Sequence, residues 1–146
     1  MGMMNLLLGM AAVVGVLLSI KFGNIKTILI TIGLALGIIL ILSPLKRFDY
    51  AGQLIYIIST IGALAYTLRF NDISKQQQKC LFGIIFPIWV YWIVAFFHFP
   101  GLGIVRFLLF FTIVAFFVGL VNRCFRRSEM GFVLIFVVDA LSLLVW

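Results

Sequence analysis

The chain has 146 residues, of which 65% are hydrophobic and 10% charged, with a mean hydropathy of +1.30 and a formal net charge of +7. Soluble domains are about 45–50% apolar and about 25% charged, so this composition excludes a water-soluble protein and predicts one transmembrane domain over residues 1–146. Nucleic-acid binding is excluded too, because the basic residues occur in short groups between apolar runs. We therefore expect membrane lipids, with anionic headgroups at the cytoplasmic face, as their partners.

Six apolar runs follow one another along the chain. A helix needs about 20 residues to cross the ~30 Å hydrocarbon core. Backbone groups in lipid must be satisfied within each segment, which favours helices. We thus predict an all-α polytopic membrane protein, a compact bundle of about six transmembrane helices. The third and sixth runs are the shortest, and a four-helix bundle with two shallow segments is the alternative. The runs are Met3–Ile20, Thr27–Leu42, Ala51–Leu68, Leu81–Phe97, Ile104–Val121 and Met130–Trp146.

Small residues recur at four-residue spacing on the first three predicted helices, with Ser59 and Ala63 on the third. Such stripes let helix backbones approach closely in lipid, within one subunit or between subunits. We interpret them as helix-packing faces. The residues are Ala11, Gly15 and Ser19 on the first helix and the Gly33-x-x-x-Gly37 pair on the second.

Loop charges predict the orientation of the chain. Eight basic residues fall in the first, third and fifth loops, against three in the second and fourth. The positive-inside rule then predicts a multi-pass protein of the cell (inner) membrane, with loops 1, 3 and 5 in the cytoplasm and both termini outside. The eight are Lys21, Lys26, Arg69, Lys75, Lys79, Arg123, Arg126 and Arg127, and the three are Lys46, Arg47 and Arg106.

An ungapped offset of 79 residues places the first three predicted helices on the last three, with Gly52 on Gly131 and Leu64 on Leu143. Membrane carriers are often built from such units. The offset raises the hypothesis of two inverted three-helix repeats, residues 1–79 and 80–146.

Asp139 is the one charged residue deep in an apolar run. A carboxylate at mid-membrane costs about 2.5–3.5 kcal/mol on insertion scales, so it normally faces a partner or a watery cavity. We predict that Asp139 binds a proton or cation along a pathway. A protonated Asp139 that joins two helices, or a shallow segment, is the structural alternative. Under the 79-residue offset Asp139 corresponds to Thr60, and Thr60 and Ser59 are the hydroxyls expected to complete the site.

Three other polar residues stand near predicted helix ends. Arg106 is expected to anchor the fifth helix at the interface, with pairing to Asp139 or a place at a pathway mouth as the alternative. Asn5 and Glu129 are interpreted as interface residues. Glu129 is expected to form a weak surface pair with Arg126 and Arg127. On the fourth helix, packing or lipid contact explains the aromatic residues Trp89, Tyr91 and Trp92.

The outer hairpin between the fourth and fifth helices reads His98-Phe99-Pro100-Gly101. It resembles the His-Trp-Pro-Gly hairpin in the membrane region of the gliding-motility motor protein L family and its small multi-pass relatives. The resemblance covers about 25 residues, with Phe99 in place of the family's Trp. It implies a hairpin flanked by two helices, and the motor member of that family is a proton-driven stator component. His98 is a candidate for a pH-sensitive group, because a histidine changes charge near neutrality.

Motifs of enzymes, cofactor sites and metal centres are absent, with one histidine and four acids in the chain. We therefore predict no catalytic residues, no cofactor and no metal. Two functions remain in competition. One is a channel or carrier for protons or small ions that acts as a homo-oligomer. The other is a non-catalytic accessory or structural subunit of a larger membrane complex, docked through the small-residue faces.

Overall fold

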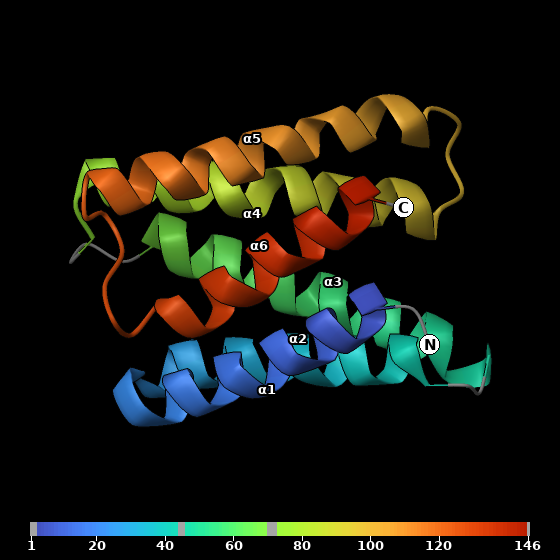
Figure 1. Cartoon of the computed structure of the whole chain (residues 1–146), viewed down its shortest axis with the longest axis horizontal. Coiled ribbons are helices and arrows are strands. Elements are labelled where there is room, and N and C mark those ends of the chain that lie inside the picture. The colour runs from blue at the N-terminus through green and yellow to red at the C-terminus, as the bar shows by residue number, and fades with distance from the viewer. Residues whose placement is uncertain (1–2, 44–45, 70–72, 146) are drawn as a thin grey trace.

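The computed structural model describes residues 3–43, 46–69 and 73–145 of the chain. This part contains six α-helices and no strand (Figure 1). Both ends of the described chain lie at the same end of the bundle as the α2–α3 and α4–α5 connections, and the other three connections lie at the opposite end. The helices are α1 (Met3–Phe22), α2 (Ile25–Leu42), α3 (Lys46–Arg69), α4 (Lys75–Phe96), α5 (Leu102–Val121) and α6 (Met130–Val145).

Polar residues extend several helices beyond their apolar runs. Ser74 caps α4 in a capping box with Gln77, so the polar stretch after it is helical rather than a loop as expected. Likewise α3 begins at Lys46 and has 24 residues. Five helices of the described chain are long and apolar enough to cross a membrane, and α3 is one of them. Flanking polar residues thus give the third segment the length of a span, which favours the six-helix prediction over a shallow third segment.

α6 occupies the middle of the bundle and has only 16 residues. It crosses between the α1–α2 pair and the α4–α5 pair (Figure 1) and packs against α1, α2, α4 and α5. Under the 79-residue offset its equivalent is α3, whose backbone closely approaches only those of α2 and α4 within the described residues, and which meets α6 through side chains such as Tyr56. The two helices thus differ in their surroundings, and the structure does not confirm two inverted repeats.

The small-residue face of α1 packs against α6. Ala11, Gly15 and Ser19 are buried, and a Cβ added to Gly15 would lie 2.7 Å from the carbonyl oxygen of Gly131 on α6. The Ser19 hydroxyl is also hydrogen-bonded to that of Thr31 on α2, at 2.7 Å. This face therefore joins helices within one chain.

The Gly33–Gly37 pair of α2 packs against α3. A Cβ on Gly33 would collide with the side chain of Ser59, and one on Gly37 would lie 2.9 Å from Cβ of Tyr56. Two helices can approach this closely only where a side chain is missing. The contact brings Tyr56 into the core, where its side chain is completely buried.

Candidate functional site

Asp139 lies in the core of the bundle with 1% of its surface exposed. Its Oδ2 atom accepts two hydrogen bonds, from the Tyr56 hydroxyl at 2.7 Å and from the Trp92 indole N–H at 2.9 Å. The donors come from α3 and α4, so three helices meet at one carboxyl oxygen. A buried charge needs such partners, because its loss of hydration is otherwise costly.

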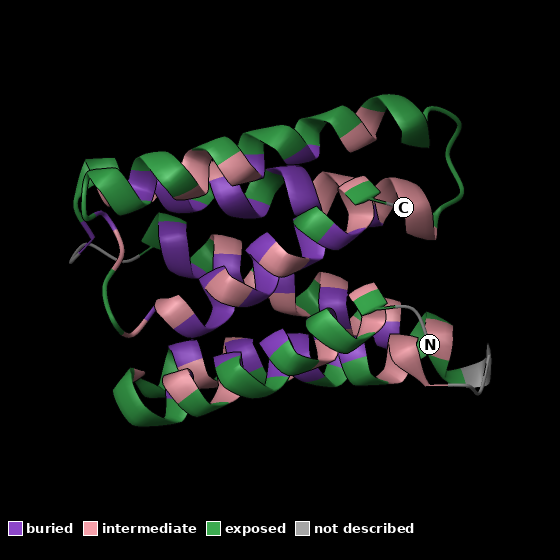
Figure 2. Ribbon diagram, viewed as in Figure 1, coloured by how far each residue is buried: buried purple, intermediate pink, exposed green. Residues whose placement is uncertain are grey.

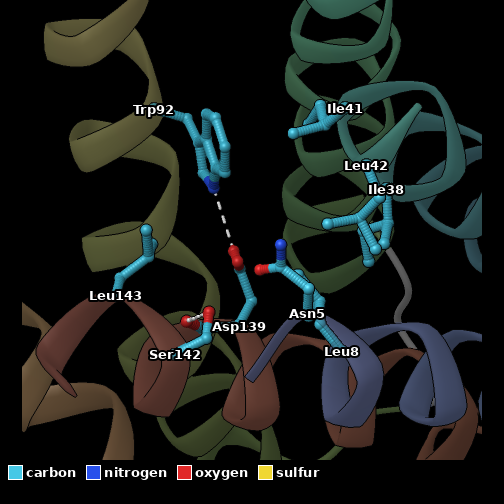
Figure 3. Close-up of a pocket in the computed structure, with 9 residues that line it drawn as sticks. All are labelled: Asn5, Leu8, Ile38, Ile41, Leu42, Trp92, Asp139, Ser142 and Leu143. Carbon is cyan, nitrogen blue, oxygen red and sulfur yellow. Dashed lines mark hydrogen bonds between the residues drawn. The ribbon is translucent and has the colours of Figure 1, made fainter. Parts of the chain in front are cut away.

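The second carboxyl oxygen, Oδ1, is buried and has no hydrogen-bond partner within the described part of the chain. Asp139 lines a cavity of about 160 Å³, together with eight other residues, most of them apolar. Figure 3 shows the Asn5 amide pointing toward the Asp139 carboxyl group. This volume is enough for more than one water molecule or for a small cation. The cavity is lined by Asn5, Leu8, Ile38, Ile41, Leu42, Trp92, Asp139, Ser142 and Leu143.

The cavity lies at the end of the bundle that contains both chain termini. Asn5 belongs to the start of α1, Leu42 ends α2, and Ser142 is near the end of α6. The positive-inside rule predicts that this end faces outward. The Ser142 hydroxyl donates to the backbone carbonyl of Asp139 at 2.7 Å, so it fixes the backbone there and leaves the carboxylate to the other donors.

Helix packing holds the two donors in place. α2 and α3 approach closely at Gly37 and Gly52, since a Cβ on Gly52 would lie 2.8 Å from the Gly37 carbonyl oxygen. This contact fixes the position of Tyr56 along the bundle. The Tyr56 ring contacts the Trp92 ring at a centroid distance of 5.2 Å and the Phe136 ring edge-on at 6.3 Å. The donors are therefore preorganised by aromatic contacts.

Glu129 is a second buried acid, just before α6, and none of its surface is exposed. Oε2 accepts from the backbone N–H of Arg126 at 3.2 Å, and the Tyr66 hydroxyl is 3.4 Å from Oε1. Burial raises the pKa of Glu129, while the backbone hydrogen bond and charge of Arg126 partly oppose the shift. The prediction of an exposed surface pair is wrong, because the chain folds back over this carboxylate.

The two acids are matched by two tyrosines of α3. Tyr56 donates to Asp139 and Tyr66 to Glu129. The two tyrosines are ten residues apart, and so are the two acids, and the two segments run in opposite directions along the bundle. At 1.5 Å per residue the separation is about 15 Å along the bundle. Phe132 fills part of this interval and is completely buried.

The predicted hydroxyl partners of Asp139 are bonded elsewhere. Ser59 donates to the carbonyl of Ile55 and Thr60 to that of Ile57, both on their own helix. The structure therefore does not join Thr60 or Ser59 to Asp139. The Tyr56 hydroxyl, one helical turn before Thr60, donates to Asp139 instead.

Arg106 and His98 also lie apart from the carboxyl group. Arg106 donates through Nε to the carbonyl of Leu143, one of the last carbonyls of α6, so it caps that helix from α5. His98 is exposed in the α4–α5 hairpin at φ 54°, and its Nδ1 lies 3.0 Å from the carbonyl oxygen of Ala95. Neither residue lines the cavity.

Sequence reasoning missed Tyr56 and Trp92. Trp92 was interpreted as packing or lipid contact, whereas its N–H donates to Asp139. A signal for Tyr56 was present, because it belongs to a stripe of small or polar residues at helical spacing on α3. The stripe consists of Gly52, Tyr56, Thr60, Ala63 and Thr67, all buried.

Cys80 and Cys124 are buried free thiols, and no group of three metal-binding side chains lies together in the described part of the chain.

Comparisons with known proteins give no significant match to a family model, a curated protein or a solved structure. The resemblance of the His98 hairpin to the gliding-motility family accordingly stays a prediction.

Proposed function

We propose that this small integral membrane protein is a carrier or channel for protons or small cations, with Asp139 as the ion-binding group. The observation that carries the proposal is the Asp139 carboxylate itself, which has two donors on Oδ2 and, beside a cavity, a buried Oδ1 without a partner among the described residues. Binding of a proton or cation at Oδ1 would neutralise the charge in a medium where an isolated carboxylate is costly.

The surroundings of Asp139 favour a carrier over a permanently open pore. The cavity opens near one end of the bundle, where Asn5 lies. Toward Glu129 the core is filled by the fully buried rings of Phe132 and Phe136. An ion bound at Asp139 could reach the other end only after these rings move, as in alternating access.

The accessory subunit is the weaker alternative. That function depends on small-residue faces that dock another membrane protein, yet Gly15 packs against Gly131 and Gly37 against Tyr56 inside the chain. The homo-oligomer remains part of our proposal, with the exposed apolar face of α5 as the available surface. Molar mass measured in detergent, after subtraction of the micelle, determines the subunit number.

Flux through vesicles made from the purified protein alone tests the proposal. Proteoliposomes with an internal pH-sensitive dye should acidify when a proton gradient is imposed with the charge balanced by a K⁺ ionophore. Asp139→Asn keeps the shape and hydrogen-bonding capacity but loses the charge, and we expect at least a tenfold slower flux. Na⁺ and K⁺ gradients then identify the ion that moves.

Asp49→Asn is the matched control, because among the described residues Asp49 accepts a hydrogen bond from Gln53 of its own helix and it lies outside the cavity. This variant should retain the flux of the native chain. Vesicles that contain folded native protein and stay passive to every ion would overturn the proposal, as would an unchanged flux in Asp139→Asn.

A further inference from the structure

We propose that the groove between α2 and α3, at the end of the bundle rich in basic residues, binds one anionic phospholipid. The groove has a volume of about 480 Å³. Two cations, a tyrosine and several apolar residues line it: Lys26, Leu29, Ile30, Gly62, Ala65, Tyr66 and Arg69. This site is separate from Asp139, and it does not depend on the proposed transport function.

The helix geometry brings the two cations together at one mouth. Lys26 is in the first turn of α2 and Arg69 is the last residue of α3, and the two helices run antiparallel as close neighbours. Both residues are exposed, and the described residues that line the groove include no acid. The nearby Glu129 is buried behind Tyr66, to which it is hydrogen-bonded, and is not exposed at the mouth. The mouth therefore attracts an anion.

Below the mouth the groove is apolar and open. Leu29 is 66% exposed, and a Cβ built on Gly62 would find only Ile30, at 3.8 Å. Gly62 thus leaves a notch on the outer side of the bundle, at a depth where hydrocarbon is the solvent. An acyl chain fits this notch, while a soluble anion would gain nothing from it.

A phospholipid combines both requirements in one molecule. Its phosphate would take charge-assisted hydrogen bonds from Lys26 and Arg69. Basic pockets between membrane helices on the cytoplasmic side are suited to acidic headgroups, and the positive-inside rule predicts that this end of the bundle is cytoplasmic. A zwitterionic lipid of the same chain length would lack the net negative charge and bind less.

Native mass spectrometry of the detergent-purified full chain tests the site. We expect retention of phosphatidylglycerol over phosphatidylcholine with identical acyl chains. Lys26→Gln with Arg69→Gln should weaken phosphatidylglycerol binding about tenfold or more, since each basic charge near an anionic surface contributes about fivefold. Gly62→Val fills the notch and should weaken both lipids.

Matched controls separate the groove from the general surface charge. Lys21→Gln with Arg123→Gln removes two exposed cations at the same end but outside the groove, and Gly9→Val adds the same side chain where nothing lies within 4 Å. Both should bind lipid as the native chain does. Equal binding of the two lipids, an equal loss in the cation control, or displacement by millimolar glycerol phosphate would overturn the proposal.

Discussion

α5 and α6 have almost the same apolar composition and opposite environments. α5 buries three of its twenty residues, Leu109, Thr112 and Gly119, and leaves most of the others exposed, whereas α6 buries nine of its sixteen (Figure 2). In water such a difference would be visible in the sequence as a polar face on the exposed helix. In lipid the solvent is as apolar as the core, so hydropathy does not separate a peripheral helix from a central one.

What distinguishes the two helices is their contact chemistry. α6 carries Asp139 and presents Gly131 to the backbone of α1. α5 carries large side chains such as Phe107 and Phe111, which are exposed, and reaches the core of α4 through the Thr112 hydroxyl, which donates to the Ile84 carbonyl at 3.2 Å. Gly131 and Asp139 thus make contacts between helices at the centre of the bundle, whereas the exposed rings of Phe107 and Phe111 lie at its edge.

The largest expected effect comes from the same substitution made on both helices. Phe136→Ala on α6 empties a fully buried site between the rings of Tyr56 and Phe132 and should lower the free energy of unfolding by about 3–5 kcal/mol through the cavity it leaves. Phe110→Ala on α5, where the ring is 54% exposed, should change it by less than about 0.5 kcal/mol. Unfolding in one detergent measures both, and equal losses would remove the distinction between the helices.

Glycine substitutions should give the next largest difference. A Cβ on Gly131 would lie too close to the Gly15 carbonyl oxygen, so Gly131→Ala should cost about 1–3 kcal/mol by overpacking. Gly103→Ala, at the start of α5 with nothing within 4 Å, should be neutral or slightly stabilising. Thermal unfolding in detergent measures both variants. A Gly131→Ala chain as stable as the native one would show that α1 and α6 do not pack this closely.

The polar core of α6 is expected to contribute a smaller amount. Tyr56→Phe removes one donor from Asp139 and should cost about 1–2 kcal/mol, while Tyr50→Phe, exposed on the same helix, should cost nothing measurable. The loss should shrink in an Asp139→Asn background, because the two groups interact directly. A double-mutant cycle on unfolding free energies tests this, and full additivity would argue against the hydrogen bond.

Glu129 should give the smallest effect, as a pH dependence. Since burial raises the pKa of Glu129, the folded chain holds that proton more tightly than the unfolded chain. The stabilisation is complete at acidic pH and is lost as the pH rises through the raised pKa, by an amount on the order of 1 kcal/mol. Glu129→Gln should remove this component from unfolding curves measured from acidic to neutral pH, and Ser128→Ala should retain it. An unchanged slope in Glu129→Gln would contradict the assignment.

Helix positions could be predicted from the sequence because each segment must satisfy its own backbone in lipid. The ends were less accurate where polar residues continue a helix: the capping box at Ser74 starts α4 six residues before the apolar run, at Lys75 rather than Leu81. The stripes at Gly15 and Gly37 were also recognised as packing faces. Their partners were not, since spacing on one helix gives no information about which helix approaches it.

The residues of the candidate site, too, were only partly predictable from the sequence. Asp139 stood out because a charge within an apolar run is costly wherever the helix lies. Tyr56 and Trp92 did not, because an aromatic residue in a membrane helix serves equally in packing, in lipid contact or as a donor. Glu129 was placed on the surface because its neighbours are arginines, while the fold covers it with Tyr66.

The sequence alone determined that this protein lies in a membrane, that its secondary structure is helical, and that Asp139 is its exceptional residue. These properties follow from local physical chemistry, namely hydropathy, backbone hydrogen bonding and the cost of a charge in hydrocarbon. Only the tertiary structure decided that α6 is central, that Tyr56 and Trp92 hold Asp139, and that Tyr66 covers Glu129. Those are contacts between distant segments, and in a chain apolar on almost every face, steric fit and hydrogen bonds rather than hydropathy select them.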